Sequence, residues 1–442
     1  MAAAGAALTA RPAAAAAKRR RVEPNRAGML DAATRGLSSE GDQTELLQTL
    51  LDETAATGDI LFLPPGDYLC GPLRLPARSR LAGIDGASRL FGPQLALEGK
   101  GIRQLSLSTL TLDGLGRPGA PGRHLVELVD CPDLSAEGCD FLGAAGHALA
   151  LTTVGGRVAQ CRIAGAVDVA LLSRDATGLH VIDNIVEDCG NGGLLVHRTT
   201  PGEDGSIVRG NRLARIRADA GGTGQYGNAI NLFKAHGVTV DGNQIADSAF
   251  SAIRSNGGSN AVITGNTCLN SGETALYAEF RFEGAVIAGN VVDGAAIGIS
   301  VANFNEGGRL ALCTGNLIRN LRSLGPYPAD APGFGMGISV EADTVVSNNV
   351  VENAPLFGLK LGWGPYLRDV AATGNVLRRC GVGIAVSVVE GAGKALIASN
   401  LISDPAAGAI VGYRWSEAVT ADLARDPGSA PSHLSLSANM AG

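Results

Sequence analysis

Aromatic residues make up only 4% of this 442-residue chain, and the sequence signals of several function classes are missing from it. The net charge is −6, and no basic field of the kind that binds nucleic acid is present. An acidic glycan is still a compatible partner, because a local basic groove can lie on an acidic protein. After the N-terminal segment, no run of apolar residues reaches the length of a membrane-spanning helix.

None of the eight cysteines belongs to a CxxC pair, so the sequence does not predict a zinc ribbon. Free cysteines behave as small apolar residues, and we expect most of these to lie in the core. A phosphate-binding loop, a haem motif and a cluster of metal ligands are also missing from the sequence. The sequence therefore predicts no metal site and identifies no cofactor.

Glycine is abundant at 62 residues, and hydrophobic residues, mainly Val, Ile, Leu and Ala, reach 45%. Aliphatic residues of this kind suit buried strands. A chain of this length exceeds what one compact core usually serves. A one-dimensional repeat array escapes that limit, because each repeat buries its apolar side against its neighbours.

An asparagine followed by an apolar residue recurs along the chain, usually after a glycine. The members of this repeat are Asn184, Asn211, Asn243, Asn266, Asn290, Asn316, Asn349, Asn375 and Asn400. Two earlier copies are expected at Asp140 and Arg162. A short strand follows most copies nine or ten residues later, as in SAIRS, TALYAEF and VGIAVS. Such strands, in coils of ~22–26 residues, predict an all-β, single-domain right-handed parallel β-helix.

The repeated asparagine has a physical role in such a fold. Asparagine tolerates the left-handed turn conformation and can hydrogen-bond backbone groups. We expect these residues to stack in register as a ladder that satisfies the turn amides of adjacent coils.

The ends of the domain show different patterns. Residues 42–58 have helical periodicity and predict a helix that caps the first coil. We expect the coils over residues 59–414 and a C-terminal cap over residues 415–442 that covers the exposed edge. Residues 1–41 would precede the domain, and the Ala-rich residues 1–17 resemble the second half of an export signal. The prediction is an exported, periplasmic protein with a truncated signal; the alternative is a disordered tail.

The string LPPGDY, followed by LRLPARSRLAG, resembles the first part of β-helices of the pectate-lyase superfamily. From Asn184 onward, GQYGNAINLFKA, AFSAIRSN and ALYAEFRFEGAVIAGN resemble the twin-arginine-translocated, uncharacterised repeat family of α-proteobacteria. The resemblance extends from residue 42 to the end. It implies the same fold, and export after folding. It implies no reaction, because none is established for that family.

Alternate side chains of a strand point to the same side, so aligned coils predict two outward columns spaced ~4.8 Å per coil. The first column is Leu195, Asn231, Arg254, Tyr277, Ser300, Ser339, Lys360 and Ala385. The second is His197, Phe233, Asn256, Glu279, Ala302, Glu341, Gly362 and Ser387. Two Gly/Pro-rich insertions, containing Tyr226 and Tyr327, are expected to flank these columns and to wall a groove.

The polar members of these columns and their neighbours are the candidate site residues. The candidate catalytic residues are Arg254, Tyr277, Glu279, Lys360 and Glu341. The candidate substrate-binding residues are Asn231, Lys234, Asn256, Arg281, Tyr226, Trp363 and His197. Trp363 suits stacking on a sugar ring, and it equally suits sealing a turn over the core.

Two chemistries fit these residue types. In β-elimination or C5-epimerisation of a uronate, Arg254 or Arg281 would neutralise the carboxylate. Tyr277, Lys360 or His197 would then remove the C5 proton. In inverting hydrolysis, Glu279 and Glu341 would flank the bond at roughly 9.6 Å, two coils apart. The bland interpretation is a solvated outer surface whose ion pairs contribute little.

The leading hypothesis is an exported carbohydrate-active or carbohydrate-binding β-helix protein, a lyase or C5-epimerase of an acidic polysaccharide. The superfamily resemblance favours this chemistry only by analogy of fold. One alternative is a non-catalytic periplasmic binding or structural repeat protein. The other is an inverting glycoside hydrolase.

Overall fold

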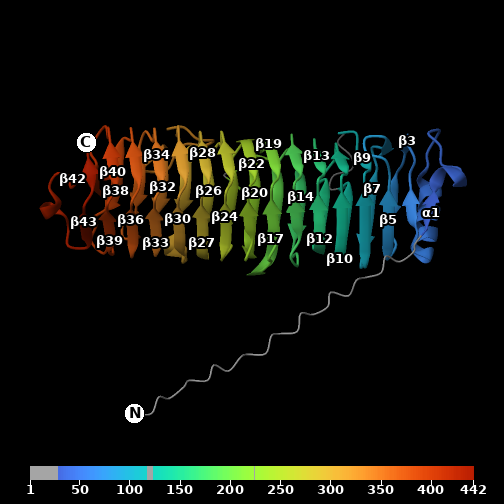
Figure 1. The fold of residues 1–442 in the computed structure, drawn as a ribbon, viewed down its shortest axis with the longest axis horizontal. Coiled ribbons are helices and arrows are strands. Elements are labelled where there is room, and N and C mark those ends of the chain that lie inside the picture. The colour runs from blue at the N-terminus through green and yellow to red at the C-terminus, as the bar shows by residue number, and fades with distance from the viewer. Residues whose placement is uncertain (1–27, 117–122, 223) are drawn as a thin grey trace, which may run out of the picture.

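The structure is a computed structural model of the chain, and it describes residues 28–116, 123–222 and 224–442. The chain winds into a long rod of stacked coils, with the helix α1 (Thr44–Thr57) at one end and the C-terminus at the other (Figure 1). The rod is a right-handed parallel β-helix, as the sequence predicts. The Ala-rich residues 1–17, on which the export prediction rests, lie outside the described residues.

The coils run through three faces, and the strands of a face pair in parallel with those of the neighbouring coils, except in the C-terminal hairpin. The first and second faces belong to one 29-stranded sheet, and the third face is a 15-stranded sheet. The first face consists of β4 (Pro72–Arg74), β7 (Ala96–Lys100), β10 (Val126–Glu137), β12 (Leu149–Ala159), β14 (Val169–Arg174), β17 (Gly192–Glu203), β20 (Asn228–His236), β23 (Ile253–Asn256), β26 (Thr274–Glu279), β29 (Ile297–Val301), β32 (Met336–Val340), β35 (Phe357–Leu361), β38 (Val382–Ser387), β41 (Ile410–Arg414) and β42 (Glu417–Asp422).

The long strands β10 and β12 continue into the second face, where they pair with strands of the neighbouring coils. The second face consists of β1 (Met29–Asp31), β2 (Ile60–Phe62), β5 (Arg78–Ala82), β8 (Gln104–Ser108), β15 (His180–Ile182), β18 (Ile207–Arg209), β21 (Thr239–Asp241), β24 (Ala261–Thr264), β27 (Glu283–Ala288), β30 (Arg309–Thr314), β33 (Thr344–Ser347), β36 (Val370–Thr373), β39 (Ala395–Ala398) and β43 (Leu434–Ser437). The third face consists of β3 (Gly66–Leu69), β6 (Ser88–Phe91), β9 (Thr111–Asp113), β11 (Asp140–Leu142), β13 (Arg162–Ala164), β16 (Ile185–Glu187), β19 (Arg212–Ile216), β22 (Gln244–Ser248), β25 (Thr267–Leu269), β28 (Val291–Asp293), β31 (Leu317–Arg319), β34 (Val350–Glu352), β37 (Val376–Arg378), β40 (Leu401–Ser403) and β44 (Met440–Ala441).

The interior of the rod is one continuous apolar cluster, in which equivalent residues of successive coils stack on one another. Ile253, Leu276 and Ile299 of the first face, for example, are paired in register and fully buried. All eight cysteines are free and buried, so the prediction that most of them are core residues is confirmed.

The N-terminal end is closed by α1, whose residues Leu47, Leu50 and Leu51 are buried against the first coils. The folded part begins earlier than the sequence suggested. Strand β1 pairs in parallel with β2, and the short 3-10 helix η1 (Ala32–Arg35) follows it. These elements lie before residue 42, where the sequence analysis expected the domain to begin, and Leu30 of β1 packs against the core.

The C-terminal segment both covers and extends the stack. Strand β42 turns back and pairs antiparallel with β41. After the 3-10 helix η3 (Pro427–Ser429), β43 and β44 pair in parallel with β39 and β40. Residues 415–442 thus form a hairpin strand and part of a further coil.

Buried asparagines form a continuous ladder at the turn between the second and third faces. The Oδ1 of Asn266 accepts the backbone N–H and the Nδ2 of Asn243, at 3.0 and 2.9 Å. The Nδ2 of Asn266 donates to the Val240 carbonyl, at 3.1 Å, and to the next asparagine, Asn290. The ladder contains all nine predicted residues and continues to Asn439, which the sequence analysis missed.

The left-handed conformation expected for the ladder asparagines is found instead in the residue before each of them. The asparagines themselves have negative φ, and the residue before each of them is left-handed, as Gly265 is at φ 64°. Glycine precedes most ladder asparagines because the left-handed region favours it. The asparagine contributes hydrogen bonds to the turn, and the glycine contributes the backbone geometry.

The two earlier copies also lie one residue away from the expected positions. Arg162 pairs in register with Ile185, so the residue equivalent to Asn184 is Cys161. The N–H of Cys161 donates to Asn184 Oδ1 at 2.9 Å, as a ladder residue does. The ladder therefore begins at Asn184, and the placement of earlier copies at Asp140 and Arg162 is wrong.

A single substitution tests the ladder. Asn243→Ala leaves buried N–H and carbonyl groups without partners, so we expect the free energy of unfolding to fall by about 3 kcal/mol. The neighbouring amide Gln244 is exposed, and Gln244→Ala should change it by less than about 0.5 kcal/mol. Urea denaturation of both variants makes the comparison, and equal stabilities would contradict a structural role for the ladder.

Candidate functional site

The strand registers of the first face bring one predicted outward column into line. Residues of β17, β20, β23, β26, β29, β32, β35 and β38 pair in succession. The column they form is Leu195, Asn231, Arg254, Tyr277, Ser300, Ser339, Lys360 and Ala385. The second column is in register from His197 through Phe233 and Asn256 to Glu279.

Although these side chains point out of the coil, solvent reaches few of them. The Arg254 side chain is 12% exposed and that of Glu279 only 1%. Lys360 is 9% exposed. A simple solvated surface does not have charged groups of this kind, because burying a charge is costly unless it is paired. The bland interpretation is therefore wrong for these three residues.

Arg254 is the centre of a buried ionic cluster. Its Nε donates to Glu279 Oε1 at 2.6 Å, and its Nη1 lies 3.6 Å from Glu273 Oε2. Asn256 Nδ2 also donates to Glu279 Oε1, at 2.8 Å. The guanidinium lies against the ring of Tyr277, with 5.2 Å between its carbon and the ring centroid. Arg254 is therefore already in contact with two carboxylates and one aromatic ring.

Both inserted loops are tied to this cluster. The Gly224 carbonyl, in the loop before β20, accepts from Arg254 Nη1 at 2.8 Å. Only glycine fits there, because φ is +116° and a Cβ would lie 1.9 Å from that nitrogen. In the loop before β32, the Tyr327 hydroxyl donates to Glu273 Oε1 at 2.5 Å. The Arg254 cluster thus holds the two insertions at the same edge of the first face.

Glu273 is the residue that the sequence analysis missed. It lies just before β26, outside the strand alternation that defined the columns, so its orientation could not be inferred from periodicity. Burial raises the pKa of its carboxyl, and the hydrogen bond from Tyr327 opposes this. The available signal was a Glu in the turn SGET, directly before the predicted strand TALYAEF.

Near Arg254, the structure disfavours the predicted role of Tyr277 and leaves Asn231 with a free polar group. Burial raises the pKa of Tyr277 well above its ordinary value, which disfavours a phenolate base at neutral pH. Asn231 is buried beside Arg254, and its Oδ1 has no hydrogen-bond partner among the described residues. That unpaired oxygen can accept a hydrogen bond from a ligand or a water molecule.

Lys360 lies three coils beyond Tyr277 along the first column, separated from it by Ser300 and Ser339. Its Nζ donates one long hydrogen bond, 3.4 Å, to Ser339 Oγ and lies 5.0 Å from the Trp363 ring centroid. Burial lowers the pKa of Lys360 to about 8, and the charge of Glu341 opposes this. The structure therefore separates Lys360 and Arg254 into two charged clusters.

Glu341 belongs to the second cluster. Its Oε2 accepts the Phe304 N–H at 2.7 Å, at the start of the 3-10 helix η2 (Phe304–Glu306). Burial raises the pKa of its carboxyl, and that hydrogen bond opposes the rise. The predicted hydrolytic pair of Glu279 and Glu341 is not supported by this arrangement, because each carboxylate is engaged by its own neighbours two coils apart.

Four predicted binding residues lie away from both clusters. His197 is half-buried and separated from Asn256 by the ring of Phe233. Burial lowers the pKa of His197 to about 4. The Lys234 amine lies over Phe233, and the Arg281 side chain is 79% exposed beside Glu306. The fourth residue, Tyr226, is an exposed residue of the first inserted loop.

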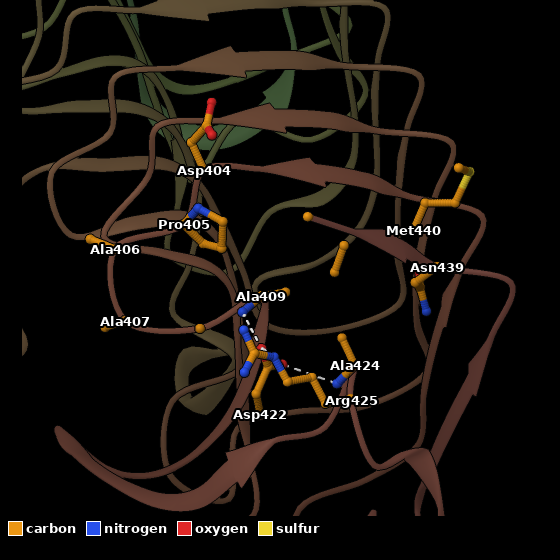
Figure 2. Close-up of a pocket in the computed structure, with 13 residues that line it drawn as sticks. Asp404, Pro405, Ala406, Ala407, Ala409, Asp422, Ala424, Arg425, Asn439 and Met440 are labelled. Carbon is orange, nitrogen blue, oxygen red and sulfur yellow. Dashed lines mark hydrogen bonds and ion pairs between the residues drawn. The ribbon is translucent and has the colours of Figure 1, made fainter.

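A large hollow lies elsewhere, at the C-terminal end of the stack, with a volume of about 770 Å³ (Figure 2). Two carboxylates, Asp404 and Asp422, line it together with Arg425. Asp422 accepts the backbone N–H groups of Ala409 and Ile410 at 3.0 Å and that of Ala424 at 3.1 Å, so it stabilises the C-terminal turn. The hollow is the open end of the last coils, and none of the predicted site residues lines it.

Within residues 28–116, 123–222 and 224–442, no three His, Cys, Asp or Glu side chains are grouped to hold a metal ion. A helix that meets the length and apolarity needed to cross a membrane is also not found in that part of the chain.

Comparison with known proteins supports the architecture. Residues 202–367 match the family described as right-handed β-helix region. No curated protein sequence matches the chain. Two solved structures from bacteriophage phi29 are similar. The gene product 12 N-terminal fragment has a TM-score of 0.55 at 14% identity, over 87% of this chain and 68% of that one. The pre-mature gene product 12 has a TM-score of 0.53 at 12% identity, over 93% and 66%.

A third similar structure is a tailspike protein mutant of the E. coli bacteriophage HK620, crystallised in complex with a hexasaccharide. Its TM-score is 0.51 at 11% identity, over 91% of this chain and 75% of that one. At these identities the three similarities show the shared fold.

Removing the central cation should destabilise the loops and the coil beneath them. Arg254→Ala leaves Glu279 and Glu273 buried without their cation, so we expect unfolding to become easier by about 3–5 kcal/mol. The control Arg281→Ala removes an exposed arginine and should have little measurable effect. Urea denaturation and limited proteolysis of the loops provide the test, and an equally stable Arg254→Ala variant would contradict the cluster's role.

The buried Lys360 should lower the free energy of unfolding by an amount that depends on pH. The unfolded chain keeps this proton up to about pH 10.5, whereas the folded protein loses it near pH 8, so wild-type stability should rise between these values. Lys360→Met should therefore be more stable than wild type by about 3 kcal/mol below pH 8. The gain should shrink toward pH 10.5, as measured by urea denaturation at several pH values. A pH-independent difference would be inconsistent with a buried ammonium.

Proposed function

We propose that this protein binds carbohydrate along the outward side of the first face, between Arg254 and Lys360. One observation carries this assignment: an outward column holds charged groups that are largely buried. Two serines, Ser300 and Ser339, lie in the column between its two charged ends. Inserted loops cover one end, and two tryptophans lie at the other.

The composition of this face suits a sugar ligand. Hydroxyl and amide groups offer hydrogen bonds to sugar hydroxyls, and aromatic rings offer flat surfaces for sugar rings. The distance from Tyr277 to Lys360 is about 14 Å by coil stacking, so a short oligosaccharide fits along it. The HK620 tailspike, which has the same fold, was crystallised with a hexasaccharide, and this supports the ligand class by analogy.

A lyase or C5-epimerase centred on Arg254 is less well supported than binding. Such an enzyme needs a free cation to neutralise the uronate carboxylate. Arg254 is already paired with Glu279 at 2.6 Å and approached by Glu273. Unless both carboxylates moved away, a substrate carboxylate would meet net negative charge at this site.

Glycoside hydrolysis is the second candidate, and the environments of Glu273 and Glu279 favour it. Burial raises the pKa of Glu273, which suits a general acid. Glu279 accepts hydrogen bonds from Arg254 and Asn256, which fix the position of a second carboxylate near Glu273. Glu273 thus takes the place that the sequence analysis gave to Glu341. Because Tyr327 covers Glu273, substrate would enter only after the second inserted loop moves.

We also propose export from the cytoplasm, with the periplasm as the destination. This rests on the Ala-rich residues 1–17 and on the resemblance to the twin-arginine-translocated repeat family.

A glycan panel tests the binding function. The purified protein is incubated with neutral and acidic polysaccharides, and binding is measured together with reducing ends and unsaturated-uronate absorbance. We expect Tyr277→Ala to weaken binding at least tenfold, and the control Leu269→Ala on the third face to leave it unchanged. New reducing ends that are lost in the Glu273→Gln variant would establish hydrolysis. A rise in unsaturated-uronate absorbance would instead support the lyase hypothesis. Failure of every glycan to bind would rule out the assignment.

A further inference from the structure

Lys360 is a buried cation without an anionic partner. No carboxylate lies within ion-pair distance of its Nζ among the described residues, and its one hydrogen bond is long, at 3.4 Å. The buried cation Arg254, in contrast, is paired with Glu279. Burying a charge without a partner is costly, so natural proteins keep such groups mainly where function needs them.

The nearest buried carboxylate does not fill this role. Glu341 influences Lys360 electrostatically, but its oxygen accepts the Phe304 N–H at 2.7 Å and forms no ion pair with the lysine. Ser387 is also engaged, because its Oγ donates to the Gly364 carbonyl at 2.6 Å. The side of Lys360 that faces the aromatic rings is therefore left without a counter-charge.

Aromatic rings form the surroundings on that side. The Lys360 Nζ lies over Trp363, and the Trp363 and Trp415 rings meet edge to face with 5.4 Å between centroids. A small cavity between Lys360, these two rings and Tyr413 has a volume of about 10 Å³. That is room for about one water-sized atom, such as one carboxylate oxygen.

The backbone holds Trp415 in place over this cavity. Its φ is +55°, in the left-handed region that non-glycine residues rarely adopt. Its ring packs on Gly364, where an added Cβ would lie 2.3 Å from the indole. Trp415 as a whole residue is still 46% exposed, so part of it is available to a ligand.

We propose that Lys360, Trp363 and Trp415 form a subsite for a sugar unit that carries a carboxylate, so the ligand class is a uronate-containing glycan. The carboxylate pairs with the Lys360 ammonium, with one oxygen in the small cavity, and the sugar ring stacks on the exposed part of Trp415. This inference rests on the proposed binding function and names its ligand class.

The chain offers a direct reporter, because Trp363 and Trp415 are its only two tryptophans. Tryptophan fluorescence therefore reports on this subsite alone. The probes are trigalacturonate, trimannuronate and a hyaluronan tetrasaccharide, each compared with its methyl ester, which keeps the rings and removes the charge. A sulfated neutral glycan, dextran sulfate, distinguishes a carboxylate site from a general anion site.

We expect at least one uronate to change the fluorescence and to bind at least tenfold more tightly than its ester. Lys360→Met should abolish that preference, and Lys360→Arg should retain part of it. The exposed-lysine control Lys100→Met should behave as wild type. Thermal unfolding of each variant verifies that it is folded.

Three outcomes would overturn the subsite. The first is equal binding of acid and ester, or a preference that survives Lys360→Met, while glycans still bind elsewhere on the protein; the proposed function then stands. The second is tighter binding of dextran sulfate than of any uronate. The subsite would then recognise a sulfate group and not a carboxylate. The third is that no glycan binds, whether it contains uronate or is neutral. That result would contradict the proposed function as well.

Discussion

The register between coils is the constraint on which the rest of this structure depends. It is set by buried hydrogen bonds that run the length of the rod, above all those of the asparagine ladder from Asn184 to Asn439. A shift of one residue would turn every outward side chain of a strand inward. Because each ladder asparagine, such as Asn266, binds the backbone of the preceding coil and the asparagine side chain of the next, such shifts are excluded. Residues about 23 positions apart, such as Arg254 and Tyr277, then meet on one face.

On this regular scaffold, the irregular segments create the chemistry. The two loops before β20 and β32 are additions to the coil, and they cover charged side chains that would otherwise be solvated. Under this cover Arg254 is the centre of an ionic cluster. At the other end of the column, Lys360 lies beside Trp363 and has no counter-ion among the described residues. The first face therefore carries a paired charge, Arg254, and an unpaired charge, Lys360. Only Lys360 can still pair with a charged ligand.

Much of this architecture could be predicted from the sequence, because a period-two strand pattern inside a regular repeat determines which residues become neighbours. The alignment of Arg254 with Tyr277 follows from counting, because each lies 11 residues after its ladder asparagine. Counting failed where the backbone departs from the repeat. Asn439 lies 39 residues after Asn400, because β42 leaves the regular coil between them.

Side chains outside the strands could not be predicted in this way. Glu273 precedes its strand, and Trp415 lies in a turn of the C-terminal segment, so neither has a periodic position. Their roles depend on how Tyr327 and Gly364 pack against them, which is a property of the folded loops. Whether an outward polar residue is solvated or covered also depends on those loops. This is why the solvated-surface interpretation was wrong for Arg254 and Lys360.

The central claim is that an acidic sugar lies on the first face with its carboxylate at Lys360. A crystal structure of the protein soaked with trigalacturonate tests it most directly. Our account predicts a sugar ring over Trp415 and a carboxylate oxygen about 3 Å from the Lys360 Nζ. A ligand bound only in the hollow at the C-terminal end, or on the second or third face, would contradict it.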